Sequence, residues 1–384
     1  MSTVAASPGA TQLAVIEARR TLERFLAAKV ARRCFPGATY GLVQSSGPLF
    51  IEQIGLLSLQ PATRVLPDGA IYDVASVTKP VITATVAMIL MERGELDLKS
   101  TVSKFLPEAP WGARMTLEDL LLHTSGLPAW RPLYAVRGST PIQVLFQVPL
   151  RFKPHGPAIY SCLDYILLGQ VLERVTGTSL RQLGRELILE PLGMRRSFFS
   201  GDAMPPPIVP TEMGNAHEVQ LMRDGSRGIP LVRAALIQGV VHDTNAFCMG
   251  GMPGNAGLFS TAADLGLYAS ALLRSLRGEP GLFAKSDTAR IMLEVRAKGT
   301  DEARSYGWMV QNGFRTSAGD RMGPGGFGHT GFTGCSLFFD PRRDIAAILL
   351  TNRVHPHIEG NPMMDIRRRF HDLCCEVVDA LGAG

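Results

Sequence analysis

Hydrophobic residues recur at helical spacing near the start of the chain. In residues 11–33 the apolar positions fall on one side of a helix, with glutamate and arginine between them, which predicts an amphipathic helix. A second helix is predicted over about residues 365–381, at the other end of the chain. The apolar positions of the first helix are Leu13, Ile16, Leu22, Phe25, Leu26 and Val30.

Each terminal helix is next to a pair of extended segments. Residues 38–44 and 49–55 are separated by Ser-Ser-Gly-Pro, a composition typical of a hairpin turn. Residues 335–339 and 345–350 are separated by Asp-Pro-Arg-Arg-Asp, in which the proline favours a turn. We therefore predict an α+β fold in which both chain ends build one antiparallel sheet that is flanked by helices.

The middle of the chain has a different pattern. Short helices are predicted between loops that are rich in glycine and proline. We predict an α/β lobe from residues 1–97 and 288–384, and a mainly helical lobe from residues 98–287. A cleft between two lobes is a common place for a ligand site. The predicted helices cover residues 116–122, 141–148, 163–175, 180–187 and 262–276.

Composition and charge restrict the partners. The net charge is +5 at pH 7, but the arginines form short scattered runs without aromatic residues between them, so we expect no nucleic-acid partner. The first nine residues lack the basic and apolar regions of a secretory signal, and the longest apolar run, 81–91, is too short to cross a bilayer. The six cysteines show no metal-ligand or disulfide-scaffold spacing. We expect a cytoplasmic location, reduced thiols and no membrane partner.

Ser76 and Lys79 are the first candidates for chemistry. Pro80 is tolerated only in the first turn of a helix, so the apolar helix should begin close to Ser76 and present Ser76 and Lys79 on one face. A lysine whose pKa is lowered by burial can take the proton of a serine hydroxyl. A chance Ser-x-x-Lys with an N-capping serine and a solvated lysine is the alternative.

Two further segments carry candidate groups. Tyr160, before the apolar stretch 163–171, could share a proton with Lys79; alternatively it is a half-buried aromatic residue whose hydroxyl meets water. The segment from Gly328 to Phe332 leads into the strand at 335–339. Its glycines leave a backbone edge against which a substrate could lie as an added strand, and the N–H of Phe332 could stabilise an oxyanion. A flexible glycine-rich loop is the alternative.

In this order, the three segments resemble the serine β-lactamase and penicillin-binding-protein superfamily. The similarity is to its class C β-lactamase-like branch, which includes DD-peptidases, D-amino-acid amidases and family VIII carboxylesterases. Stretches at 120–127, 257–265 and 339–341 look like the same branch. The resemblance implies a β-lactamase/transpeptidase-like fold, and it implies no metal and no organic cofactor.

The resemblance also implies a role for each matched residue. Ser76 would be the acylated nucleophile, and Lys79 and Tyr160 the proton-transfer pair. The backbone N–H groups of Ser76 and Phe332 would form the oxyanion hole. Substrate-binding roles would fall to Cys162, His329, Thr330 and Gly331.

Two positions depart from the usual pattern. Cys162 occupies the place of an asparagine that, in the family, donates to the acyl-side carbonyl of the substrate and orients the lysine. Cysteine is a weak and shorter donor, so recognition of an amide-bearing substrate is in doubt. His329 replaces a lysine and is only partly charged near neutral pH, which weakens recognition of a substrate carboxylate, although histidine does occur here in some relatives.

We therefore expect a serine hydrolase that uses an acyl-enzyme. A carboxylesterase for small to medium acyl esters is favoured. Amide hydrolysis, by a D-amino-acid amidase, DD-peptidase or β-lactamase, is the alternative. A non-catalytic binding protein that retained the fold is an alternative of another class. The partner is a small-molecule ester or amide, and the natural substrate and oligomeric state stay open.

Overall fold

A computed structural model describes residues 8–62, 65–224, 230–299, 303–311, 316–360 and 362–382. Both chain ends meet in one eight-stranded antiparallel sheet, with the strand order β2-β1-β11-β10-β9-β8-β7-β6. The predicted α+β fold class, with a sheet built from both ends of the chain, is confirmed. The strands are β1 (Gly37–Gln44), β2 (Gly47–Gly55), β6 (Ala297–Lys298), β7 (Ala303–Arg304), β8 (Met309–Val310), β9 (Phe327–Thr330), β10 (Ser336–Asp340) and β11 (Ile345–Thr351).

Both predicted hairpins are present, with small differences at their turns. The N-terminal hairpin turns more tightly than expected, because Gly47 already pairs with Gln44 and only two residues remain in the turn. The C-terminal hairpin pairs Asp340 with Ile345, so Pro341 lies in the turn as expected. β1 joins the two hairpins by pairing with β11 from Ala38↔Thr351 to Val43↔Ala346.

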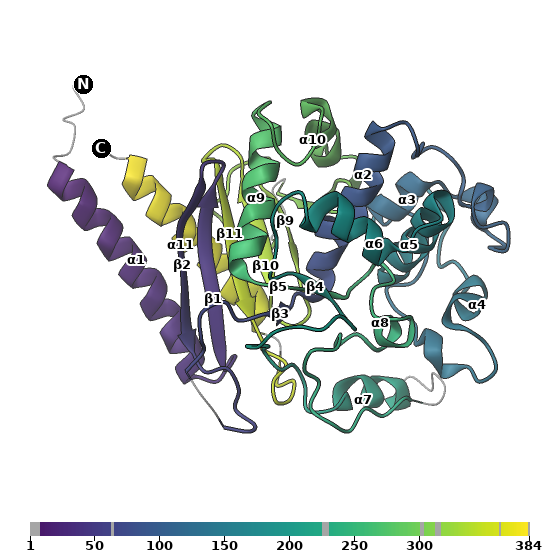
Figure 1. The fold of residues 1–384 in the computed structure, drawn as a ribbon, viewed down its shortest axis with the longest axis horizontal. Helices are drawn as coiled ribbons and strands as arrows, with labels where there is room; N and C mark the ends of the chain where they lie inside the picture. Colours follow the sequence, from purple (N-terminus) through teal and green to yellow (C-terminus); the bar gives the residue numbers. More distant parts are fainter. Residues whose placement is uncertain are drawn as a thin grey trace.

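Helices cover both faces of this sheet. The terminal helices α1 (Pro8–Ala31) and α11 (Met363–Gly382) lie side by side on the outer face, and α9 (Ala262–Leu276) covers the inner face (Figure 1). Strand residues therefore contribute to two apolar clusters. Leu42 and Leu349 pack with α1 and α11, and Val43 and Ile348 pack toward α9 and the helical region.

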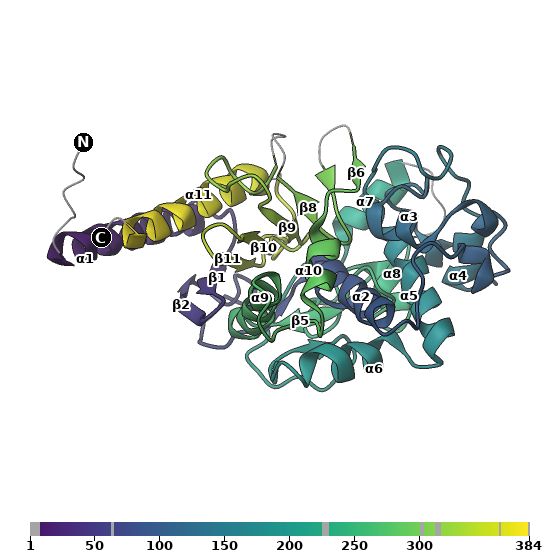
Figure 2. The same cartoon turned by 90° about the horizontal axis from the view of Figure 1, so that it is seen from above.

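The remaining helices gather on the far side of α9, away from α1 and α11, as Figures 1 and 2 both show. Three of them match the predicted segments 116–122, 141–148 and 163–175 to within two residues, whereas the helices at 216–224, 244–248 and 286–293 were not predicted. Thr116, for example, caps α3 through a reciprocal pair of hydrogen bonds with Asp119. The predicted helix at 180–187 differs in type, because its α-helical part ends at Gly184 and a π-helical turn follows. These helices are α2 (Thr85–Glu92), α3 (Leu117–Leu122), α4 (Pro141–Phe146), α5 (Cys162–Thr176), α6 (Leu180–Gly184), α7 (Ala216–Asp224), α8 (Thr244–Cys248) and α10 (Ser286–Leu293).

Some elements were not predicted. Strands β6, β7 and β8 extend the sheet beyond β9, and a second sheet has the order β3-β5-β4. α9 lies within the range predicted for the helical lobe but packs against β1 and β11. The division of the chain into two lobes stays a prediction. The second sheet consists of β3 (Tyr72–Asp73), β4 (Phe198–Phe199) and β5 (Leu258–Ser260).

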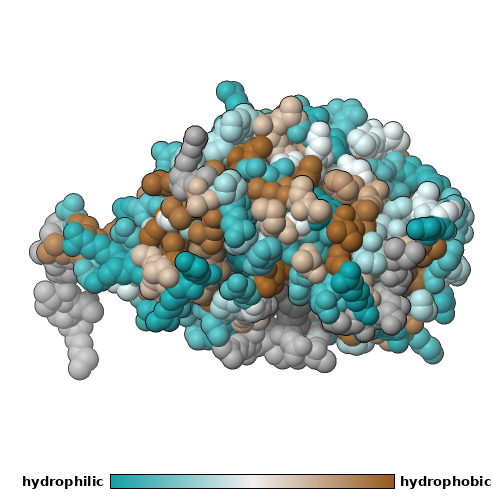
Figure 3. Space-filling model, turned by 90° about the horizontal axis from the view of Figure 1, so that it is seen from below, coloured by the Kyte–Doolittle hydropathy of each residue, from teal (hydrophilic) through white to brown (hydrophobic). Residues whose placement is uncertain are grey.

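The apolar helical segment after β3 begins close to Ser76, as predicted. Among the described residues, Ala75–Glu92 is the one helical stretch whose length and composition would suffice to cross a membrane, and 83% of it is buried inside the protein. Burial of this extent is typical of a core helix. On the face of the molecule seen in Figure 3, apolar side chains form separate patches among hydrophilic ones.

Candidate active site

Ser76 lies where the chain passes from β3 into the buried helical segment. Its turn, Ala75–Val77, is a 3₁₀-helix, and Lys79–Ala84 is a π-helix that leads into α2, so the regular α-helix predicted here begins later. Ala75 has a left-handed backbone (φ 48°), an unfavourable conformation for alanine that is common beside functional residues. The carboxylate of Asp73 supports this turn by accepting hydrogen bonds from the N–H of Ala75 (2.9 Å) and of His242 (2.8 Å).

Lys79 is completely buried and directed at Ser76. Its Nζ lies 3.0 Å from Ser76 Oγ and donates to the carbonyl oxygen of Asn255 at 2.9 Å. Burial lowers the pKa of Lys79, because the ammonium form is poorly solvated inside the protein. The alternative of a solvated lysine is wrong, and an amine with a lowered pKa beside a serine hydroxyl can act as a base.

Tyr160 meets the same serine from the other side. Its hydroxyl donates to Ser76 Oγ at 2.9 Å, and its ring lies 5.0 Å from Lys79 Nζ. Burial raises the pKa of Tyr160 well above its usual value, so the resting side chain is a neutral phenol. A neutral phenol that is hydrogen-bonded to Ser76 can relay a proton between Ser76 and Lys79.

The Cys162 thiol is the third group around Lys79. Its Sγ lies 3.5 Å from Lys79 Nζ and 3.8 Å from the Tyr160 hydroxyl. Ser161 caps α5 by accepting a hydrogen bond from the N–H of Leu163, which places Cys162 in the first turn of that helix. The thiol therefore takes up the position next to the lysine without offering the strong donor of an asparagine amide.

His329 and Thr330 form the end of strand β9. The glycine-rich edge is only partly open, because Phe327 and Gly328 pair with β8; the edge available to an added strand therefore begins at His329. The ring of His329 is buried, and its Nδ1 donates to the carbonyl oxygen of Thr330 at 2.8 Å. Burial lowers the pKa of His329 well below its usual value. The expected partial charge near neutral pH is wrong, and this imidazole is neutral.

The turn after β9 is held tightly against the Ser76 turn. Gly331 approaches so closely that a Cβ on it would lie 2.4 Å from the carbonyl oxygen of Val74. The hydroxyl of Thr333 donates to the carbonyl oxygen of Asp73 at 2.8 Å. Glycine is needed here because of this close backbone approach. This contact holds the turn that leads into Phe332 against the turn that leads into Ser76. An oxyanion hole from the N–H groups of Ser76 and Phe332 stays a prediction.

The side chain of Phe332 stacks on two histidine rings and an arginine. It stacks on His242 and His217, with ring centroids 5.6 and 6.1 Å away, and the guanidinium of Arg353 lies 4.7 Å from its centroid. Arg353 Nε also donates to the carbonyl oxygen of Phe332 at 2.8 Å. These contacts orient the residue that follows Gly331, although 44% of its surface remains exposed.

The comparison with protein families agrees with this geometry. The Beta-lactamase family model matches residues 22–366, which is most of the chain. The chain belongs to the beta-lactamase family. Members of this family are serine hydrolases, and this protein is therefore an enzyme of that class.

Individual relatives of this beta-lactamase family chain differ in their activities. A protein of Escherichia coli strain K12, named as a candidate D-alanyl-D-alanine carboxypeptidase, is 31% identical over 324 residues, which cover 77% of this chain and 72% of the relative. The structure of EstCE1, described as a hydrolase with promiscuous acyltransferase activity, has a TM-score of 0.71 at 21% identity, covering 96% of this chain and 99% of EstCE1. A D-stereospecific amidohydrolase from Streptomyces sp. has a TM-score of 0.64 at 22% identity, covering 90% of this chain and 96% of that chain.

Three residues of this beta-lactamase family site were not identified from the sequence. Asn255 is buried, and its backbone carbonyl oxygen accepts a hydrogen bond from Lys79 Nζ. His123 is buried 4.9 Å from the Tyr160 ring, and its Nδ1 lies 3.0 Å from the Asp164 carboxyl. The guanidinium of Arg304 lies 5.3 Å from the Tyr160 ring centroid. His123 lies in the stretch 120–127, which resembles the family, so it could have been identified from the sequence. No motif in the sequence pointed to Asn255 or Arg304.

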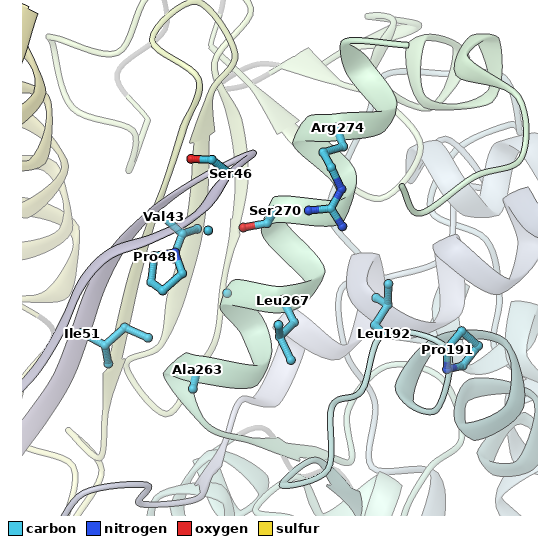
Figure 4. A pocket seen from close by; sticks show the side chains of 12 residues that line it. Val43, Ser46, Pro48, Ile51, Pro191, Leu192, Ala263, Leu267, Ser270 and Arg274 are labelled. Carbon is cyan, nitrogen blue, oxygen red and sulfur yellow. The ribbon is translucent and has the colours of Figure 1, made fainter. Parts of the chain in front are cut away.

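Two cavities lie away from this site. The larger, of about 520 Å³, is between the β1–β2 hairpin, α9 and the turn at Pro191 and Leu192 (Figure 4). Ser76, Lys79 and Tyr160 do not line either cavity. Within the described part of the chain there is also no group of three or more acidic, histidine or cysteine side chains placed to hold a metal ion.

Proposed function

We propose that this protein is a carboxylesterase that hydrolyses small to medium acyl esters through an acyl-enzyme on Ser76. The observation that carries the proposal is the position of Ser76 Oγ, which lies 3.0 Å from Lys79 Nζ and 2.9 Å from the Tyr160 hydroxyl. Both distances are within the range for direct proton transfer. This arrangement also argues against a non-catalytic binding protein.

In the first half of the reaction, the amine of Lys79 takes the proton of Ser76, either directly or through the Tyr160 hydroxyl. Ser76 Oγ bonds to the ester carbonyl carbon, and the carbonyl oxygen becomes an oxyanion between the N–H groups of Ser76 and Phe332. The carbon–oxygen bond to the alcohol then breaks. The proton held by Lys79 passes through Tyr160 to the departing alcohol oxygen, which leaves an acyl group on Ser76.

In the second half, water takes the place of the alcohol. Its proton passes to Lys79 as the water oxygen bonds to the acyl carbon, and the bond to Ser76 Oγ breaks as that oxygen is reprotonated. The products are one carboxylic acid and one alcohol per ester. The same groups act as base and then as acid in both halves, so no cofactor is required in this scheme.

Two features favour esters over amides. The thiol of Cys162 is a weak donor for the acyl-side carbonyl of a peptide or β-lactam. The neutral, buried ring of His329 offers no positive charge to a substrate carboxylate. An ester needs neither contact, because its alcohol is an easier leaving group than an amine. The fold shared with EstCE1, itself described as a hydrolase, is in keeping with this choice.

Amide hydrolysis is the second candidate. The relatives at 30–31% identity are named as candidate D-alanyl-D-alanine carboxypeptidases, and the fold is shared with a D-stereospecific amidohydrolase. In either case the substrate is a small ester, amide or peptide. The cytoplasmic location stays a prediction; residues 1–7, on which it partly depends, lie outside the described residues.

The test compares three substrate classes on one preparation of the protein. We expect p-nitrophenyl butyrate to be hydrolysed with a higher kcat/KM than nitrocefin or an acylated D-alanyl-D-alanine peptide. A fluorophosphonate should add one mass adduct to the protein, and Ser76→Ala should abolish both the adduct and the hydrolysis. Faster turnover of nitrocefin or the peptide would reject the esterase assignment and support the second candidate.

Cys162→Asn tests the structural reason for the preference. An asparagine amide would supply the missing donor, so amide turnover should rise more than ester turnover, by about tenfold in their ratio for one hydrogen bond of about 1.4 kcal/mol. Cys248→Asn, at another partly buried cysteine, is the matched control. If the ratio of amide to ester turnover were unchanged in Cys162→Asn, the Cys162 thiol would not explain the preference for esters.

A further inference from the structure

Two basic side chains lie near the ring of Tyr160. Lys79 Nζ lies 5.0 Å from the ring centroid, and the guanidinium carbon of Arg304 lies 5.3 Å from the same centroid. Both side chains are buried, with 0% and 3% of their surfaces exposed. Because the protein interior has a low effective dielectric constant, a positive charge on either group influences the phenol more strongly than a surface charge would.

The sheet brings Arg304 to this position. β7 pairs Arg304 with Met309 of β8, and β8 pairs Met309 with Gly328 of β9. Arg304 therefore lies two strands away from His329 on an extension of the sheet that ends beside the catalytic groups. The site has a fixed cation that comes from outside all three sequence motifs.

Arg304 differs from His329 in carrying a positive charge near Tyr160. The His329 ring lies 5.9 Å from the Tyr160 ring, at the position where related enzymes can have lysine, but it is neutral. Arg304 is positively charged under all ordinary conditions. The other titratable groups that face Tyr160 and Lys79 are Cys162, Asp164 and Tyr165 from α5, His123 from the end of α3, and the more distant Asp243.

We propose that Arg304 is a positioning residue of the reaction, which supplies beside Tyr160 the positive charge that a lysine in place of His329 would otherwise provide. It holds the phenol ring from one side and stabilises negative charge on the phenol oxygen while the Ser76 proton is relayed. This inference rests on the proposed use of Ser76, Lys79 and Tyr160.

The charge of Arg304 favours the deprotonated form of both partners. After the effect of burial, it contributes to the lowered pKa of Lys79 and opposes the raised pKa of Tyr160. Removal of the charge should therefore raise the pKa of both groups. A charge at about 4–6 Å shifts a pKa by about one unit or more, and the Arg304 guanidinium lies 5.3 Å from the Tyr160 ring centroid. We therefore expect the acid limb of the pH profile to move to higher pH by about one unit.

The experiment is the pH dependence of kcat/KM for p-nitrophenyl butyrate in full-length variants. Arg304→Gln should shift the acid limb upward by about one unit and lower kcat/KM at pH 7 about tenfold or more, with recovery at alkaline pH. Arg304→Lys should keep the limb within about half a unit. Adding His329→Lys to Arg304→Gln should return the limb toward its original position.

Arg296→Gln is the matched control, since Arg296 also lies over a tyrosine ring, but over that of Tyr306, at 5.1 Å, and it forms ion pairs with Glu118 and Glu294. It should leave the limb unmoved. A uniform loss of activity at every pH in Arg304→Gln, or an equal shift in Arg296→Gln, would overturn the proposal.

If Arg304→Gln does not fold, His329→Lys alone decides, because a second cation beside Tyr160 should move the limb to lower pH, and an unmoved limb would overturn the proposal. Absence of any fluorophosphonate adduct on wild-type Ser76 would instead refute the proposed function, so the two failures are distinguishable.

Discussion

A methyl group added at Gly331 tests whether the close approach of two backbone segments builds the oxyanion hole. The alanine Cβ would lie 2.4 Å from the Val74 carbonyl oxygen, whereas ordinary contact begins at 3.4 Å. The two segments would therefore have to move apart by up to 1.0 Å. Gly331 does not have the positive φ that disfavours alanine, so the clash is the main effect of this substitution.

Gly331 has little freedom to relieve that clash by moving away. Its N–H donates to the carbonyl oxygen of Cys335 at 2.7 Å, and its own carbonyl oxygen accepts a hydrogen bond from Arg367 at 2.7 Å. Overpacking of this kind costs about 1–3 kcal/mol of stability. The Phe332 N–H would be displaced from Ser76 by a substantial fraction of an ångström.

The expected consequence is a large loss of activity in a folded protein. Misplacement by about 1 Å, or loss of one oxyanion donor, lowers the rate by about 100-fold, or about 2.7 kcal/mol. We expect Gly331→Ala to reduce kcat/KM for p-nitrophenyl butyrate by this factor, with most of the change in kcat. Urea denaturation should show that the variant is still folded under the assay conditions.

Gly323→Ala is the matched control for this prediction. Its Cβ would meet only the flexible side chain of Arg342, at 3.2 Å, so its activity should stay within about twofold of wild type. If Gly331→Ala retained activity within about threefold of wild type, the contact between Val74 and Gly331 would not position an oxyanion donor. An equal loss in Gly323→Ala would assign the effect to the loop in general.

Two further predictions concern buried cations and imidazoles around the sheet. Burial lowers the pKa of His371 to about 3, below its unfolded value of about 6.5, so its contribution to stability is present above pH 6.5 and is lost as the pH falls toward 3. Between pH 7 and pH 4 the wild-type free energy of unfolding, measured by urea denaturation, should fall by about 3 kcal/mol because of this group. If the free energy of unfolding of His371→Gln depended on pH as steeply as that of the wild type, this prediction would be contradicted. Arg367 donates to the carbonyl oxygens of Gly331 (2.7 Å) and Cys335 (3.0 Å). Arg367→Met should therefore lower kcat/KM about tenfold, the effect of losing one such charged hydrogen bond. Full activity in a folded variant would show that the turn holds its position without Arg367.

Local sequence patterns were sufficient for much of the sheet and the helices. Alternation and turn composition located both hairpins, since each strand and its turn are contiguous in the chain. Thr116 and Asp119 have the spacing of a capping box, and α3 begins there. The spacing of Ser76 and Lys79 placed both side chains on one face even though the turn is a 3₁₀-helix followed by a π-helix.

Other elements carry too little local signal to be predicted. Strands β6, β7 and β8 have two residues each, and a pair of residues shows no periodicity. They exist because β9 offers an edge to β8 and each strand then pairs with the next. Arg304 reaches Tyr160 only through this series of pairings, so no motif could have identified it.

The amino-acid sequence by itself determined the two hairpins, the terminal helices and the three motifs, because these depend on the spacing of residues along the chain. Tertiary structure alone decided the charges in the site. The lowered pKa of Lys79, the neutral ring of His329 and the cation over Tyr160 all result from burial and from contacts between distant segments. Desolvation is a property of the folded surroundings of a group, and the identity of the residue does not specify it.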